Sequence, residues 1–425
     1  MTTQPHESRT AFGPLAGVRV ITFTQAWSGT FATELLGFLG ADVIQIEARR
    51  RPDTWRGGYQ GAIPEAIQGA AERQRRWNVG PLYNAVNLNK RGITLDIGDP
   101  QGAEYFRRLV PLADVIVDNF SPRVMGNWGL AYADLDALRP GIIQASLSAY
   151  GASGPYRDIP GIGGTIEPMS GMSSLLGYED GNPLNSGNMY PDPVAGVYMT
   201  TAIVAALRHR ATTGEGQYID LGMMEANATF VGDAFAEFTA NGRVRPRMGN
   251  RHPRVAPHGI YEAAGGQWLA LSADDESQWT ALKGVLAIPA LDATAFATMA
   301  ERKGREDELD AHIADWARGQ DATLAEQLLQ QAGVPAARVR LPDEVLADAQ
   351  LRAREFVVSV THPEAGTHEM VGVPWRFSRT PAQVTRPSPM LGQHSQEVLG
   401  DLLGVTSDEY ESLVERNVSG DEPPQ

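Results

Sequence analysis

The chain has 425 residues, of which 42% are hydrophobic and 20% charged, so it carries enough apolar surface to fold, and disorder over most of its length is excluded. Its 36 Lys and Arg residues against 51 Asp and Glu residues give a formal net charge of −15 at pH 7, which argues against a broad surface for nucleic acid or anionic membranes. The absence of cysteine excludes disulfides, thiolate metal sites and a cysteine nucleophile.

The sequence gives no signal for a metal site or for membrane insertion. The eight histidines are scattered, and no pair has the HxxxH or HExxH spacing of a zinc site, so we expect no metal. The first residues, MTTQPHESRT, lack the apolar segment of a signal peptide. No apolar run reaches the roughly 18 residues of a membrane-spanning helix. We therefore expect a cytoplasmic protein.

The first regular pattern follows a polar tail at residues 1–14. Val18–Thr24 is a short, β-branched apolar run typical of a buried strand. Ser28–Gly40 has helical spacing between a capping serine and a terminal glycine, and Ala41–Glu47 has the pattern of a second strand. This order predicts a β-α-β unit at the start of an open parallel sheet.

The alternation resumes after an irregular segment rich in Arg, Gly and Pro at residues 49–87, which is expected to cover a site or a partner. Three further strands are predicted at Gly92–Ile97, Asp114–Phe120 and Gly141–Tyr150, and a helix begins at Pro100. The sequence thus favours an α/β fold with a doubly wound parallel sheet.

The second half begins with a loop region rich in Gly, Ser and Pro at residues 151–192, of the kind that binds ligands beyond strand ends. A long apolar helix is predicted at Val194–Arg210, a strand at Gln267–Ser272 and a helical end at Ser395–Glu415. The expected division is a tail at 1–14, a large domain at 15–225, a linker at 226–255, a small domain at 256–335, a linker and return to the large domain at 336–418, and a disordered tail at 419–425.

The first β-α turn, FTQAWSGTFAT, contains only one glycine, Gly29, where a dinucleotide-binding fingerprint needs G-x-G-x-x-G. A dinucleotide bound in the usual manner is therefore disfavoured. Ser28 and Gly29 could still offer backbone amides to an anion at the helix N-terminus, or simply cap the helix.

Asp192, in YPDPVAG at the start of the long helix, is the leading candidate for a reactive group. An Asp before a Pro is a common helix cap. A carboxylate held at a helix N-terminus beneath a Gly-rich loop is also a positioned nucleophile, kept ionised by the helix dipole. The two interpretations are compatible.

Glu167 and the neighbouring residues Asn119 and Phe120 also allow both a functional and a structural interpretation. Glu167, in GIGGTIEPMSG, is either an acid–base group or a carboxylate that binds amides within a tight loop. Asn119 and Phe120 end a strand at the expected ligand edge, where they could hold a purine ring by hydrogen bonding and stacking, or serve as a turn residue followed by a core aromatic.

Several segments, each weak alone, together resemble the family III CoA-transferases, the group of formyl-CoA transferase and carnitine CoA-transferase, with the α-methylacyl-CoA racemases as relatives. The resemblance covers about residues 14–402. It rests on segments in matching order, including PLAGVRVITFTQAWSGTFATELLGFLGADVIQIE, NLNKRGITLDI, ADVIVDNFSPRVMGNWGL, SLSAYGASGPY, DPVAGVYMTTAIVAALRHRATTGEGQYIDLGMMEA, GNRHPRVAPHGIY and PMLGQHSQEVL.

The resemblance implies a Rossmann-like large domain, a smaller inserted α+β domain, and an interlocked, ring-like homodimer. It places the family's nucleophilic aspartate at Asp192. The implied substrates are an acyl-CoA and a carboxylic acid, exchanging coenzyme A through an aspartyl anhydride and an aspartyl-CoA thioester. A Gly-rich loop such as Gly161–Thr165 would supply amides to the developing oxyanions.

The resemblance also implies which residues contact coenzyme A. Those positions are Trp27, Ser28, Arg49, Leu95, Asp96, Ile97, Asn119, Phe120, Arg123, Gly161 and Ile162. Departures from the family pattern leave the phosphate contacts open, because Ala48, Gly98 and Asn127 stand where basic residues are usual.

A further departure concerns Gly163, which occupies a position where the family has an acidic residue. In the racemases that acid moves the α-proton, so its absence argues against racemisation, and Glu167 is a candidate to compensate. The leading prediction is an acyl-CoA:carboxylate CoA-transferase. The alternatives are a 2-methylacyl-CoA racemase and a non-catalytic CoA-binding subunit of a hetero-oligomer; a nicotinamide oxidoreductase is remote.

Overall fold

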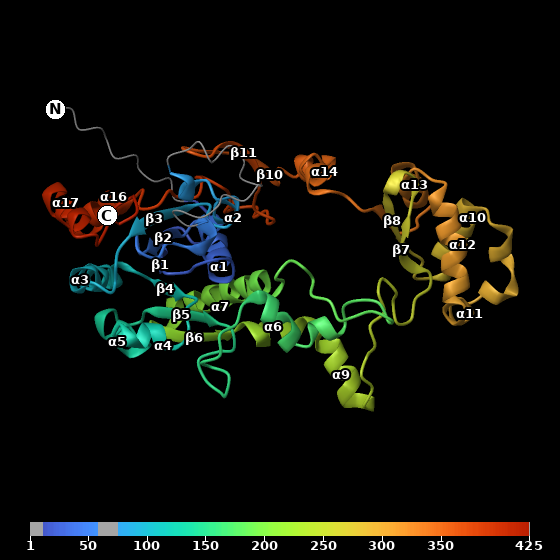
Figure 1. The fold of residues 1–425 in the computed structure, drawn as a ribbon, viewed down its shortest axis with the longest axis horizontal. Helices are drawn as coiled ribbons and strands as arrows, with labels where there is room; N and C mark the ends of the chain where they lie inside the picture. The colour runs from blue at the N-terminus through green and yellow to red at the C-terminus, as the bar shows by residue number, and fades with distance from the viewer. Residues whose placement is uncertain (1–11, 58–74, 425) are drawn as a thin grey trace. The chain divides into compact units, whose positions relative to one another are not determined.

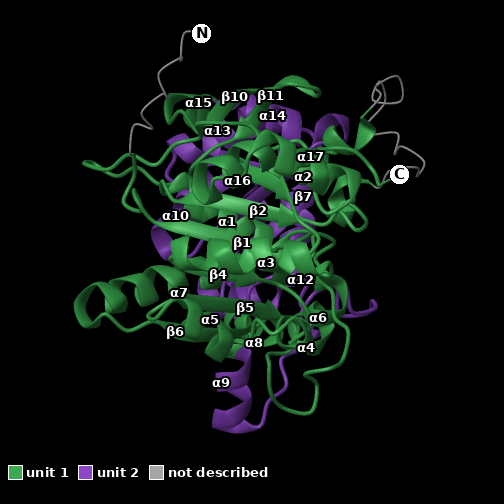
Figure 2. Cartoon of the chain, turned by 90° about the vertical axis from the view of Figure 1, so that its left-hand side faces the viewer, with its two compact units in different colours: residues 1–172, 185–233, 349–425 green, residues 173–184, 234–348 purple. Residues whose placement is uncertain are grey.

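The computed structural model describes residues 12–57 and 75–424 (Figure 1). Most of the expected N-terminal tail and the middle of the irregular segment at 49–87 therefore lie outside the described residues. The chain divides into two compact units: unit 1 comprises residues 1–172, 185–233 and 349–425, and unit 2 comprises residues 173–184 and 234–348 (Figure 2). The expected small domain at 256–335 lies inside unit 2.

Unit 1 is built on a six-stranded, fully parallel sheet with the order β3-β2-β1-β4-β5-β6. The strands are β1 (Arg19–Thr22), β2 (Asp42–Glu47), β3 (Lys90–Thr94), β4 (Val115–Asp118), β5 (Ile143–Ser148) and β6 (Gln217–Gly222). The predicted α/β class and parallel sheet are confirmed. The order reverses direction between β1 and β4, and the crevice beyond the carboxyl ends of strands at such a point is where doubly wound folds bind ligands.

Helices cover both faces of this sheet (Figure 1). One face packs Ile21, Ile44 and Ile93 against α3, α4, α5, α16 and α17. The other packs Val20, Val115 and their neighbours against α1, α6, α7 and α8. The helices of unit 1 are α1 (Ser28–Phe38), α2 (Pro81–Ala85), α3 (Pro100–Leu109), α4 (Arg123–Asn127), α5 (Tyr132–Leu138), α6 (Gly163–Met169), α7 (Pro191–Thr213), α8 (Met223–Ala228), α15 (Ala349–Ala353), α16 (Ser395–Leu403) and α17 (Ser407–Glu415).

Burial on both faces explains why the strand sequences are runs of Val and Ile rather than alternating patterns. Within one helix layer, α1 and α7 cross closely because Gly196 brings the helix backbones together: a Cβ there would lie 2.9 Å from the Ser28 carbonyl oxygen and 3.0 Å from the Phe31 ring. A separate hairpin of β10 (Val357–His362) and β11 (Gly366–Val371) completes unit 1.

Unit 2 has its own core around an antiparallel sheet in the order β7-β8-β9. Its strands are β7 (His258–Glu262), β8 (Trp268–Ser272) and β9 (Ala336–Arg338), and its helices are α10 (Glu276–Leu286), α11 (Met299–Gly304), α12 (Glu306–Arg318), α13 (Ala322–Gln331) and α14 (Pro342–Leu346). Helix α9 (Gly232–Asn241) runs from unit 1 into unit 2.

The end of the chain differs from the expected disordered tail over residues 419–424. Ser419 is buried, and its hydroxyl donates to the Thr94 carbonyl at 2.8 Å. The Arg49 guanidinium donates to the carbonyls of Ser419 at 2.7 Å and Glu422 at 2.6 Å. This segment is ordered because a buried arginine needs acceptors, and the backbone carbonyls supply them. Over the described residues, none of the helices has the length and apolarity to cross a bilayer.

Candidate active site

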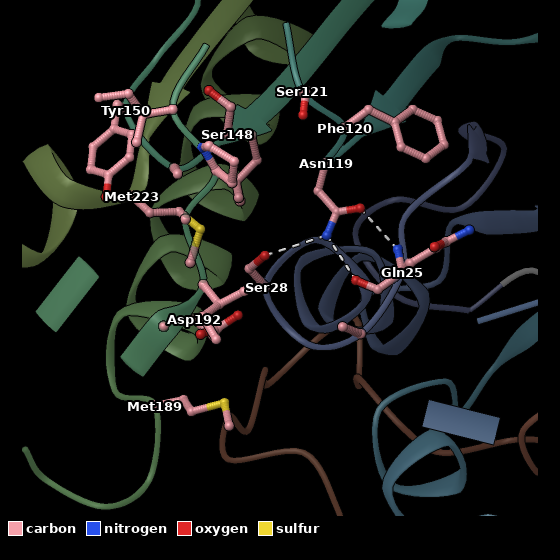
Figure 3. A pocket seen from close by; sticks show the side chains of 18 of the residues that line it. Gln25, Ser28, Asn119, Phe120, Ser121, Ser148, Tyr150, Met189, Asp192 and Met223 are labelled. Atoms are coloured by element: carbon pink, nitrogen blue, oxygen red, sulfur yellow. Dashed lines mark hydrogen bonds between the residues drawn. The ribbon is translucent and has the colours of Figure 1, made fainter. Parts of the chain in front are cut away.

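A cavity of about 430 Å³ opens in unit 1 beyond the carboxyl ends of β1, β4 and β5, at the point where the strand order reverses (Figure 3). The start of α7 and the loop between β5 and α6 supply the rest of its wall. Its lining includes Gln25, Ala26, Ser28, Thr54, Trp55, Asn119, Phe120, Ser121, Ser148, Tyr150, Arg157, Ile159, Gly161, Ile162, Gly163, Met189, Asp192 and Met223.

The turn between β1 and α1 is held in place by Asn119 (Figure 3). The Asn119 Oδ1 accepts from the Gln25 amide at 2.9 Å, and its Nδ2 donates to the Gln25 carbonyl at 2.8 Å. Gly29 is required beneath this turn, because a Cβ would overlap the Thr24 side chain and lie 3.1 Å from the Asn119 Cβ. The amide of Asn119 is thus engaged within the protein, while Phe120 packs edge-on against Trp128 with centroids 5.4 Å apart.

A buried carboxylate supports the same turn from behind. Both Asp53 oxygens accept from the Ala26 amide, at 3.1 and 3.0 Å, and Oδ1 also accepts from the Trp55 amide at 2.8 Å. Ala26 has a left-handed φ of 58°, a strained conformation for a residue with a side chain. Burial raises the pKa of Asp53 to about 6, and the nearby Glu47 carboxylate raises it further.

Asp192 lies in the first turn of α7 rather than at its cap. Pro191 takes the first helical position and Tyr190 precedes the helix, because proline's fixed φ suits that position. Asp192 Oδ2 is buried and has no hydrogen-bond partner among the described residues. Burial raises the pKa of Asp192 to about 6, and a hydrogen bond from the Ser28 amide opposes that rise. At neutral pH the group is therefore an ionised carboxylate with an oxygen available to a reactant.

Gly163, at the start of α6, lies directly against this carboxylate. A Cβ at Gly163 would overlap Asp192 Oδ2 and would lie 2.8 Å from the Met189 Cβ. At the neighbouring Gly164 a Cβ would meet nothing within 4 Å. The resemblance to the family implies an acidic residue at the position of Gly163; in this structure the place where such a side chain would begin is taken by Asp192 Oδ2.

Glu167 lies away from the cavity. Its side chain is fully buried, its Oε1 accepts from the Ser186 amide at 2.5 Å, and its Oε2 accepts from the Ser186 hydroxyl at 2.9 Å. These bonds anchor the segment that leads to Met189 and Asp192. Of the two interpretations of Glu167 from the sequence, this arrangement corresponds to a carboxylate that binds amides within a tight loop.

The other predicted contacts divide into two groups. Ser28, Asn119, Phe120, Gly161 and Ile162 line the cavity. Trp27, Arg49, Leu95, Asp96, Ile97 and Arg123 are not among its lining residues. Trp27 packs against the lining residue Trp55, with centroids 5.6 Å apart.

The remaining members of the second group are placed by other interactions. Leu95 and Ile97 are in the apolar core, and Asp96 forms an ion pair with Arg50. Arg123 is exposed at the start of α4. Arg49, as described above, holds the C-terminal segment.

Sequence reasoning missed Ser148, Arg157 and Met223. Ser148 ends β5, and its hydroxyl is buried without a partner among the described residues. Its place at the end of a predicted strand was the available signal. No signal in the sequence pointed to Met223 or Arg157, because their approach to the cavity depends on how distant segments pack. Within the described ranges no group of three or more His, Asp or Glu side chains could hold a metal ion.

Comparisons with known proteins identify the family of the chain. The sequence profile of the family described as CoA-transferase family III matches residues 15–395. The chain is similar to a succinyl-CoA–D-citramalate CoA-transferase of Chloroflexus aurantiacus, with 34% identity over 95% of this chain and 98% of that protein. It is 32% identical to a succinate–glutarate CoA-transferase of Agrobacterium fabrum, over 92% of this chain and 96% of that one.

Among solved structures, a CAIB/BAIF family protein from Brucella suis has a TM-score of 0.81 and 29% identity, covering 92% of this chain and all of the other. The sequence match and the fold match both extend over nearly the whole chain. The chain belongs to CoA-transferase family III, as its sequence motifs predicted.

Proposed function

We propose that this enzyme moves coenzyme A from an acyl-CoA donor to a carboxylic acid acceptor, with Asp192 as the covalent nucleophile. The observation that carries the proposal is the Asp192 carboxylate itself, with Oδ2 buried and unpartnered in a cavity at the carboxyl edge of the sheet. Buried polar atoms are normally hydrogen-bonded. One that faces a cavity is therefore expected to have its partner, or its reaction partner, in the ligand.

The proposed transfer has four steps that conserve charge. The Asp192 carboxylate attacks the thioester carbonyl, so a C–O bond forms, the C–S bond breaks, and CoA thiolate leaves an aspartyl anhydride. The thiolate then attacks the aspartyl carbonyl, forming an aspartyl-CoA thioester and releasing the donor acid as its carboxylate. The acceptor carboxylate attacks that thioester to give a second anhydride and thiolate. Thiolate attack on the acceptor carbonyl gives the new acyl-CoA and restores Asp192.

The neighbourhood of Asp192 supports these steps. The Ser28 amide stabilises the carboxylate between turnovers. The amides in the first turn of α6, at Gly163 and Gly164, are suited to donate to an oxyanion formed beside Asp192. The absence of an acidic side chain at Gly163 disfavours the racemase alternative, which needs a second proton-transfer group at that position.

The substrates we propose are thioesters and salts of short dicarboxylic acids. The names of the two relatives above specify succinyl-CoA or succinate with citramalate or glutarate. For coenzyme A itself, the cavity-lining residues Ser28, Asn119, Phe120, Gly161 and Ile162 remain the proposed contacts.

The test is peptide mass spectrometry after incubation with an acyl-CoA panel, with hydroxylamine or borohydride trapping. We expect a trapped derivative at Asp192 in the wild type and none in Asp192→Asn, whose amide is not nucleophilic. Asp118→Asn is the matched control, because Asp118 is a buried carboxylate at the end of β4 whose pKa burial also raises to about 6, yet it does not line the cavity. A derivative that persists in Asp192→Asn, or none with any donor, would contradict the mechanism.

We also propose that the active species is a homodimer. Apolar side chains lie exposed along α7 and beside it, at Tyr190, Val197, Tyr198, Val204 and Phe230, with exposed fractions of 36–52%. Such groups of exposed apolar residues are typical of a surface that another chain covers. Gel filtration with light scattering of the purified chain tests this. Full activity of a dimer excludes the non-catalytic subunit, and an inactive monomer would overturn the proposal.

A further inference from the structure

The cavity is almost free of formal charge. Among its described lining residues, only Asp192 and Arg157 carry ionic side chains. The other lining side chains are uncharged, some polar and some apolar. Among the apolar ones, Ile159, Ile162 and Met189 are exposed by 47%, 65% and 47%. Any second anionic group of a substrate in this cavity therefore has one cation available within the described lining.

Arg157 has little to hold it within the protein. Among the described residues its one ion pair joins Nε to Asp158 Oδ2 at 3.7 Å, between side chains exposed by 47% and 61%. Exposed pairs of this kind contribute between about 0 and 1 kcal/mol. Other arginines of unit 1 are firmly engaged: Arg56 with Glu47 at 2.7 Å, and Arg210 with Asp114 at 2.7 Å. The Arg157 guanidinium is therefore available to a ligand.

The loop that carries Arg157 is the one that reaches Asp192. It leaves β5 at Ser148, runs past Arg157 and Ile159, and enters α6 at Gly163, which contacts the Asp192 carboxylate. The cation and the nucleophile thus line the same cavity of about 430 Å³.

We propose that Arg157 forms a carboxylate-binding subsite that receives the second, non-reacting carboxylate of a dicarboxylic donor or acceptor. This inference rests on the proposed transferase function and assigns its specificity to one residue. A guanidinium binds a carboxylate through two parallel hydrogen bonds. It also offsets the repulsion between the ionised Asp192 and a dianionic substrate, which a neutral wall would leave uncompensated.

The experiment compares substrates that differ only in the distal group. Succinyl-CoA and butyryl-CoA serve as donors, and glutarate and pentanoate as acceptors, with the wild type, Arg157→Gln and Arg157→Lys. The readouts are kcat/KM and the trapped derivative at Asp192. We expect Arg157→Gln to lower kcat/KM for succinyl-CoA by about 10- to 100-fold, the usual effect of removing a hydrogen bond to a charged group. Butyryl-CoA should change by no more than about 3-fold, and Arg157→Lys should retain part of the preference.

Two control variants sharpen the comparison. Asp158→Asn removes the weak ion-pair partner and should leave the preference for succinyl-CoA intact. Arg354→Gln removes an exposed arginine of unit 1 that does not line the cavity, and it should also leave the preference intact.

The outcomes separate the subsite from the function it rests on. An equal loss for both donors in Arg157→Gln would mean that Arg157 binds the coenzyme A part that the two donors share, and would overturn the subsite. No loss for either donor, or a wild type that prefers butyryl-CoA, would overturn it as well. Calorimetric binding of glutarate against pentanoate tests the subsite without catalysis. If Asp192 forms no derivative but glutarate binds more tightly than pentanoate only when Arg157 is present, the covalent mechanism fails and the subsite stands.

Discussion

Gly163 and Asp192 are in direct contact: the Asp192 Oδ2 occupies the position where a side chain on Gly163 would begin. The first residue of α6 and a residue in the first turn of α7 thus share one space. A glycine at 163 is what allows the carboxylate to take its observed position, so the missing acidic residue and the placement of the proposed nucleophile have a single steric explanation.

This contact predicts a specific effect of Gly163→Ala. The added methyl group must displace the Asp192 carboxylate or Met189, and we expect kcat to fall by about 10- to 100-fold, as for a small misplacement of a reacting group. Gly164→Ala is the matched control, since a Cβ there meets nothing within 4 Å. Equal kcat values for the two variants would contradict the steric argument. Thermal unfolding of both variants checks that the fold is retained.

The raised pKa of Asp192 predicts how the covalent step depends on pH. Only the ionised carboxylate attacks, so with a pKa of about 6 the rate of anhydride formation should fall about tenfold per pH unit below 6 and level off above 7. Quenched-flow trapping of the Asp192 derivative between pH 4.5 and 8 measures this.

A control is needed because Asp53 and Asp118 also have pKa values of about 6. Circular dichroism over the same pH range reports whether the fold persists. A trapping rate that stays constant down to pH 5 would show that Asp192 is not the titrating nucleophile.

The bonds of Glu167 predict different effects for two substitutions. Glu167→Gln keeps an oxygen for the Ser186 amide and a polar group for its hydroxyl, so turnover should remain within about 3-fold of the wild type. Glu167→Ala leaves both Ser186 donors without their acceptor and should lower the free energy of unfolding by about 1–3 kcal/mol. Denaturant titration and steady-state kinetics check the pair. Loss of turnover in a stably folded Glu167→Gln would instead indicate acid–base chemistry.

The buried ion pair between Arg56 and Glu47 predicts a large effect on stability. The two side chains are 0% and 1% exposed, 2.7 Å apart, and Tyr83 donates to the same Glu47 oxygen at 3.2 Å. Arg56→Met leaves an uncompensated buried carboxylate beside Asp53, and we expect a loss of about 3–5 kcal/mol in the free energy of unfolding. The double variant with Glu47→Gln should recover part of that loss, because it removes the unpaired charge. Urea denaturation of the single and double variants measures the coupling.

Much of the fold and the leading site residue followed from the sequence. The β-branched runs predicted five strands of the main sheet before the long helix, and each overlaps an observed strand, because a strand buried on both faces leaves a continuous apolar signature. Asp192 stood out because its Asp-Pro dipeptide marks the start of a long helix, and the family motifs placed the nucleophile there. Strand ends were less exact: the run at Val18–Thr24 became β1 at Arg19–Thr22, since the last residues turn toward α1.

What the sequence could not determine were the contacts between segments that are far apart along the chain. Arg49 was expected among the coenzyme A contacts, yet it binds the carbonyls of residues 419 and 422. Glu167 looked like a second reactive carboxylate, yet Ser186 holds it. Composition and periodicity report on local conformation and burial, whereas the partner of a buried charge depends on which distant donor or acceptor the packing brings within about 3 Å. The sequence therefore determined the sheet, the family and the position of Asp192, and the tertiary structure decided which charges remain free to meet a substrate.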